Sequence, residues 1–156
     1  TVTTLNLIVV GGCKNINLTI NEGIEILNAT SGLASLNYKG SLTSLLQINS
    51  QYTNRNTKIY VDDEIITELV VPTECRIIGE GVFSYLPLDY VEIGSHVTSV
   101  GDDAFRSATI GEAIIHYGIE HVNAFSMATY NKVSAPQKII KSATDIKIMA
   151  TVKENE

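Results

Sequence analysis

The chain can be laid over itself at a constant offset of 22 residues. Apolar positions meet apolar positions in the two copies, and glycine meets glycine. The aligned pairs are Ile66 with Leu88, Leu69 with Val91, Val71 with Ile93, Cys75 with Val97, Ile78 with Val100, Gly79 with Gly101, Val82 with Ala104 and Phe83 with Phe105. A third copy begins at Ile110 and closes two residues early, with Ala124-Phe125. A repeat period in the twenties predicts a solenoid, in which each unit buries its apolar face only by stacking on its neighbours.

Each copy contains two parts with different apolar spacing. The first part, residues 88–93 in the second copy, alternates as a short strand does, and residues 130–135 continue the series. The second part, residues 97–105, has the wider spacing of a turn followed by a short helical or 3₁₀ segment. We therefore predict a β-rich α/β solenoid with short parallel strands and with short helical or 3₁₀ segments on its convex side.

The regular array is expected to span residues 58–136, and the segments on either side of it lack the fixed period. Residues 1–57 are expected to form either a β-rich N-terminal cap or irregular repeats, and residues 137–156 a C-terminal cap or tail. The repeats themselves are expected at 66–87, 88–109, 110–129 and, in part, 130–136.

Local patterns divide the first half of the chain further. Residues 5–10 and 15–20 are β-branched or alternating and predict strands. The spacings Leu33-x-x-Leu36 and Leu42-x-x-Leu45 echo the strand pattern of the later repeats. The polar residues 50–57 predict a loop.

A β-hairpin is expected where the regular array starts. Asp62-Asp63 is a turn signal between two apolar stretches, Ile59–Val61 and Ile65–Val71. Both stretches are therefore predicted to be strands, and Pro72 ends the second of them.

Three phenylalanines occupy the same slot of successive copies. Phe83, Phe105 and Phe125 should therefore stack as a buried aromatic spine. Gly79 and Gly101 also share a slot, which predicts a backbone position that needs a positive φ or a close approach to another segment. Cys75 takes the slot of a buried valine and is expected to be a free core thiol.

These motifs resemble the BspA-type leucine-rich repeats of bacterial and protozoan surface proteins, over residues 59–136. The matching residues are Leu69, Val71, Pro72, Ile78, Gly79 and Phe83 in the first copy, and Val91, Ile93, Ser95, Val97, Thr98, Ser99, Val100, Gly101, Ala104 and Phe105 in the second. The resemblance implies a right-handed leucine-rich-repeat solenoid that is displayed or secreted and that serves adhesion to host or matrix components. Similar repeats also occur in phage-encoded proteins.

Residue patterns that would support catalysis, a metal or a cofactor are missing from the sequence. The histidines His96, His116 and His121 have no metal-ligand spacing, and no C-x-x-C pair occurs. Gly11-Gly12 is not followed by a phosphate-binding motif, and no G-x-S-x-G is present. The sequence therefore predicts a protein that is not an enzyme and that needs neither a metal nor a cofactor.

The acidic charge is concentrated in the repeats. Residues 61–128 contain two arginines and twelve acidic residues, which gives 2 − 12 = −10, whereas the whole chain carries −6. Such a block repels phosphate backbones, so nucleic acid is not an expected partner. The sequence contains no apolar run of the roughly 20 residues that a membrane span requires, so membrane insertion is not expected either.

Candidate binding residues lie at the strand positions that alternate with the core. In a curved solenoid these outward side chains form one continuous surface. We expect one column of Glu68, Tyr90, Glu112 and Lys132, and a neighbouring column of Val70, Glu92, Ile114 and Ser134. Tyr90 is the strongest candidate, because tyrosine is enriched among residues that dominate binding energy. A plain solvated strand face remains open as the alternative.

Two functions of different kinds are compatible with these features. The first is a non-enzymatic surface or secreted adhesion module that binds a protein or a glycan through the strand face. The second is a structural element of a larger fibre, such as a phage tail appendage, in which residues 1–57 mediate oligomerisation. The expected location is extracellular or at the cell surface, or on a virion for the second function.

Overall fold

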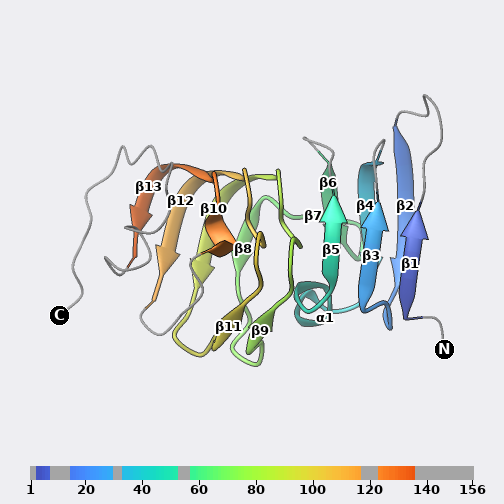
Figure 1. Ribbon diagram of the computed structural model, residues 1–156, viewed down its shortest axis with the longest axis horizontal. Coiled ribbons are helices and arrows are strands. Elements are labelled where there is room, and N and C mark those ends of the chain that lie inside the picture. Colours follow the sequence, from blue (N-terminus) through green and yellow to red (C-terminus); the bar gives the residue numbers. More distant parts are fainter. Residues whose placement is uncertain (1–2, 8–14, 30–32, 53–56, 117–122, 136–156) are drawn as a thin grey trace.

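The computed structural model describes residues 3–7, 15–29, 33–52, 57–116 and 123–135. They form a β-solenoid of stacked coils, with β1 and β13 near opposite ends of its long axis (Figure 1). Almost all neighbouring strands are parallel. The predicted solenoid of short parallel strands is therefore confirmed.

Three sheets and one two-stranded ladder make up the coils. The first sheet has the order β1 (Thr4–Leu7), β3 (Ile26–Ala29), β5 (Asn49–Tyr52), and the second β2 (Ile16–Asn21), β4 (Leu33–Lys39), β6 (Lys58–Val61), β7 (Glu64–Ile65). The third has the order β13 (Thr129–Ser134), β12 (Thr109–Ile115), β10 (Pro87–Ile93), β8 (Glu68–Val70), and the ladder pairs β11 (Ser99–Val100) with β9 (Ile77–Ile78). Within the described residues, the helical segments are α1 (Leu42–Leu46) and the 3₁₀ helix η1 (Asn123–Phe125).

The first half of the chain also stacks in parallel coils. Thr4 pairs with Ile26 and Ile26 with Asn49, which are steps of 22 and 23 residues. Coil length varies more in the second sheet, where Asn17 pairs with Ser35 after a step of only 18. This variation explains why no constant period is visible in the sequence of this half.

Two local predictions in the first half are wrong. Part of the predicted loop 50–57 is strand β5, which pairs with β3 along its whole length. The segment around Leu42 and Leu45 is the helix α1, not a strand. Here a capping signal overrides the Leu-x-x-Leu spacing, because the Ser41 hydroxyl accepts a hydrogen bond from the Ser44 backbone N–H at 3.1 Å.

The expected hairpin forms, but it is shorter than predicted. β6 and β7 pair antiparallel across Asp62 and Asp63, both of which have positive φ values of 47° and 73°. The predicted second strand, Ile65–Val71, is divided into β7 and β8. Between them the Ile66 N–H still donates to β6, whereas the Thr67 carbonyl accepts from Asp89, so the chain passes from one sheet to the next.

The aromatic spine is present as predicted. The ring centroids of Phe83 and Phe105 are 5.7 Å apart, those of Phe105 and Phe125 are 4.8 Å apart, and both pairs are stacked. All three rings are fully buried. Cys75 is a buried free thiol, as expected, and burial raises its pKa.

The shared glycine slot is explained by close approach of neighbouring coils. Neither Gly79 nor Gly101 has a positive φ. A Cβ atom added to Gly101 would lie 2.5 Å from the Glu80 backbone nitrogen, and one added to Gly79 would overlap the Ile48 carbonyl oxygen. Each of these glycines therefore allows the backbone of one coil to rest directly on that of the preceding coil.

Candidate binding surface

The third sheet aligns the predicted surface residues in two columns. Tyr90 pairs with Glu68 on β8 and with Glu112 on β12, and Glu112 pairs with Lys132 on β13. In the second column Val70 pairs with Glu92, Glu92 with Ile114, and Ile114 with Ser134. The predicted register of this surface is therefore correct at every position.

The degree of exposure differs along these columns. Glu68, Val70 and Lys132 are exposed, and the exposed fraction of Val70 is 56%. The remaining members are only half-exposed; they are Tyr90, Glu92, Glu112, Ile114 and Ser134. The apolar neighbours of both columns, such as Leu69 and Val91, are completely buried. The surface thus lies directly over the buried core.

Glu92 is held by two side chains. Its Oε2 accepts a hydrogen bond from the Tyr90 hydroxyl at 2.7 Å, and its Oε1 lies 3.3 Å from Nε2 of His116. Because an ionised carboxylate only accepts, His116 must carry its proton on Nε2 in this contact. The hydrogen bond from Tyr90, followed by that from His116, lowers the pKa of Glu92.

The same hydrogen bond raises the pKa of Tyr90 to about 12. Partial burial and the charges of Glu92, Glu112 and Glu68 act in the same direction, since all of them disfavour a phenolate. Tyr90 therefore stays a neutral hydrogen-bond donor at physiological pH.

The surface carries an excess of negative charge. Lys132 forms an ion pair with Glu112 and is the only basic residue of β8, β10, β12 and β13. These strands hold four acidic residues, Glu68, Asp89, Glu92 and Glu112, so their net charge is 1 − 4 = −3. A cationic group on a partner would complement this surface.

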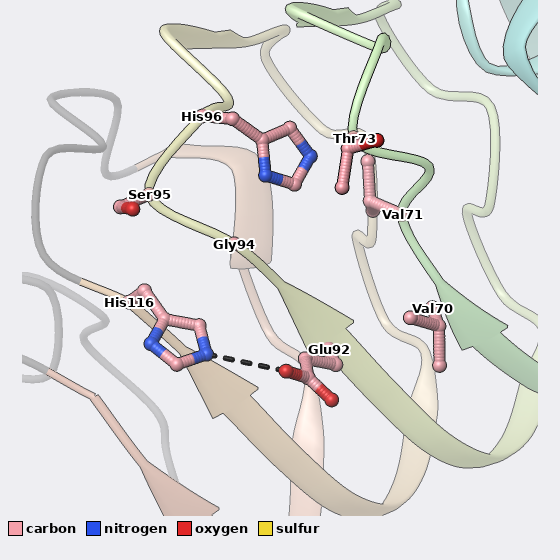
Figure 2. A pocket seen from close by; sticks show the side chains of 8 residues that line it. All are labelled: Val70, Val71, Thr73, Glu92, Gly94, Ser95, His96 and His116. Atoms are coloured by element: carbon pink, nitrogen blue, oxygen red, sulfur yellow. Dashed lines mark hydrogen bonds and ion pairs between the residues drawn. The ribbon is translucent and has the colours of Figure 1, made fainter.

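A shallow pocket of about 260 Å³ lies at one end of the surface, beyond the C-terminal ends of β8 and β10. Figure 2 shows Glu92 and His116 on one side of it, and the ring of His96 extending across it toward Thr73. Its lining residues are Val70, Val71, Thr73, Glu92, Gly94, Ser95, His96 and His116.

Sequence reasoning did not assign a role to His96 or His116. Both follow the C-terminal end of a strand, and parallel strands bring such positions together at one edge. Their positions after neighbouring strands could have predicted that the two rings lie at one edge of the sheet. The sequence has no metal-ligand spacing that would have indicated a shared site. Among the described residues, no group of three histidine, cysteine or acidic side chains is arranged to hold a metal ion. His121 lies outside the described residues.

The raised pKa of Tyr90 should depend on Glu92. Replacing Glu92 with alanine should lower the pKa of Tyr90 from about 12 toward the ordinary value of about 10. Because the folded value is the higher one, the Tyr90–Glu92 contact should stabilise the fold fully below pH ~10 and lose this effect as the pH rises through about 12. NMR titration of the tyrosine ring signals measures the pKa of Tyr90 in the wild type and in the Glu92→Ala variant. A wild-type Tyr90 that titrates near the ordinary value would contradict the contact.

The stacked coils with their strand ladder and inward phenylalanines define a leucine-rich-repeat solenoid. The family model described as "BspA type Leucine rich repeat region (6 copies)" matches residues 11–111 and 53–148, which together cover most of the chain. The chain belongs to this family. The match also includes most of the irregular first half, where the sequence itself showed no fixed period.

Comparisons with curated proteins and with solved structures find no match. Members of the family are typically surface proteins that function in binding, and their repeats generally serve as non-enzymatic scaffolds for protein interaction. No helix within the described part of the chain is long and apolar enough to cross a membrane.

Proposed function

We propose that this chain is a non-enzymatic adhesion module, on a cell surface or secreted, that binds a protein or glycan partner through the strand face of its solenoid. The observation that carries the proposal is the two-column register of the third sheet, which sets mostly polar side chains, together with Val70 and Ile114, over an apolar core. A parallel ladder of this kind holds its side chains at fixed spacing, so little conformational freedom is lost on binding.

Tyr90 lies at the centre of the proposed interface. Its neighbours in the ladder are Glu68 and Glu112, and its hydroxyl is fixed by Glu92. A half-exposed tyrosine in a fixed orientation offers a partner a large apolar ring at low entropic cost. We therefore expect Tyr90 to contribute more to binding than the charged residues at the rim of the surface.

The proposal is tested with ligands selected by the intact chain from a random-peptide library and from a glycan array. Tyr90→Ala should weaken the selected ligands by about 1–2 kcal/mol or more while the chain stays folded, with its melting temperature lowered only by the loss of the Tyr90–Glu92 contact. The matched control is Tyr60→Ala, because Tyr60 is a half-buried tyrosine of β6 in a different sheet. Isothermal calorimetry gives the affinities.

Selected ligands that bind the folded Tyr90→Ala variant as tightly as the wild type would contradict the proposal and move the interface away from the strand face, with residues 1–57 as the next candidate. Size-exclusion chromatography with light scattering addresses the alternative role in a fibre. A stable trimer that depends on residues 1–57 would favour a structural element of a larger fibre, whereas a monomer favours the binding module.

A further inference from the structure

We infer that the pocket beside Glu92 accepts one arginine side chain of a protein partner. The inference rests on the proposed function of the strand face and assigns the partner a chemistry. It is drawn from the size of the pocket, its apolar wall, the fixed carboxylate of Glu92 and the charge of the surrounding strands.

The pocket has the size and the walls for a single long side chain. Its volume of about 260 Å³ is below the roughly 300–1,000 Å³ of pockets that hold drug-sized ligands. Val70 and Val71 form an apolar wall, while Glu92 and His116 supply polar atoms on another side. An arginine buries its methylene stem along apolar surface and extends its charged head to polar partners.

Glu92 is prepared to receive a cation. Its two oxygens each take one contact from Tyr90 or His116, and an ionised carboxylate has about four acceptor positions. Two acceptor positions therefore remain. Because both existing contacts hold the carboxylate in place, a ligand does not have to order it on binding.

The ring of His96 forms another wall of the pocket. Nε2 of His96 is buried and has no hydrogen-bond partner among the described residues. The ring lies against Gly94, where an added Cβ would come within 2.6 Å of it, and extends across the pocket toward Thr73 (Figure 2). Because Nε2 is closed off from solvent, His96 serves as a wall of the pocket and not as a hydrogen-bond acceptor for a ligand.

The two open acceptor positions of Glu92 favour arginine over lysine. A guanidinium carries its N–H donors in a planar fork that matches both oxygens of one carboxylate, whereas the lysine ammonium is a point charge. The net charge of −3 on the four strands further favours a cation over a neutral sugar. A protein partner with an exposed arginine therefore complements both the apolar wall of the pocket and the carboxylate of Glu92.

The test uses N-acetyl-arginine N-methylamide as the probe and the histidine ring signals in NMR as the measurement. The chain has three histidines, so the signals of His96 and His116 are readily assigned by substitution. The probe should shift both signals in a saturable manner. The citrulline analogue, which is nearly isosteric but neutral, should bind at least ten times more weakly, and the lysine analogue should also bind more weakly.

Two variants and one control make the experiment specific. Glu92→Gln should weaken the arginine probe at least tenfold. Val70→Lys should do the same, because it adds a positive charge at an exposed position of the rim without disturbing the core. The control is Glu80→Gln, since Glu80 is exposed and lies outside the pocket.

Three outcomes would overturn the inference: no saturable shift with the arginine probe, equal binding of the citrulline analogue, or tighter binding of the lysine analogue or of methyl glucoside. Failure of the proposed function looks different, because it appears as library ligands that are insensitive to Tyr90→Ala. Ligands that depend on Tyr90 while the arginine probe fails would refute the arginine pocket alone.

Discussion

Replacing Phe105 with alanine is expected to lower the free energy of unfolding by about 3–5 kcal/mol. The ring is completely buried and is stacked on Phe83 on one side and on Phe125 on the other. Its loss would leave a cavity in the middle of the array. In a solenoid each coil is stabilised mainly by its nearest neighbours. The contacts of the Phe105 coil with the coil of Phe83 and with the coil of Phe125 would therefore both weaken.

Equilibrium unfolding in urea measures the effect of Phe105→Ala. Met127→Ala is the control, because Met127 lies near the same end of the solenoid and has an exposed fraction of 53%. That change should alter stability by no more than about 0.5 kcal/mol. A Phe105→Ala variant as stable as the control would mean that the aromatic spine does not hold the coils together.

The second large effect is expected from adding a single methyl group, in Gly101→Ala. The new Cβ atom would lie 2.5 Å from the backbone nitrogen and 2.7 Å from the Cα atom of Glu80. Backbone atoms of a neighbouring coil cannot move aside as a flexible side chain can, so the two coils must separate. We expect a loss of about 1–3 kcal/mol or more, as in other overpacked sites.

Asp102→Ala provides the matched control, since Asp102 is the next residue and is exposed. Thermal unfolding of both variants, followed by circular dichroism, gives the comparison. If Gly101→Ala unfolds at the same temperature as Asp102→Ala, the close contact between these coils is not required for stability. Amide hydrogen exchange at Gly101, whose N–H donates to the Ile78 carbonyl oxygen at 2.8 Å, reports the separation directly.

The regular part of the fold could be predicted from sequence because its side chains repeat. The slot shared by Phe83, Phe105 and Phe125 identified the core, and the alternation around Val91 identified the strand face. The irregular part could not be predicted in the same way. There the coils differ in length, and α1 is determined by a serine cap and not by the spacing of its leucines.

The candidate surface was predictable for a related reason, and the pocket was not. Registration in a parallel ladder follows from residue spacing alone, so the columns of Tyr90 and Glu92 could be written down from the sequence. The hydrogen bonds of Glu92 depend on side-chain geometry, which spacing does not determine. His116 contacts a residue 24 positions away, and His96 enters the pocket only because Gly94 leaves room for its ring.

Coil length and strand register are independent in this solenoid. Tyr90 and Glu112 are paired across a step of 22 residues, and Glu112 and Lys132 across a step of 20, yet both pairs belong to one straight column. Insertions and deletions are therefore absorbed in the connections between strands, and the strand face keeps its order. A gene encoding such a chain can gain or lose codons in these connections without shifting the strand face. Each surface residue can also change separately, so new binding specificities can arise by point substitution on an unchanged scaffold.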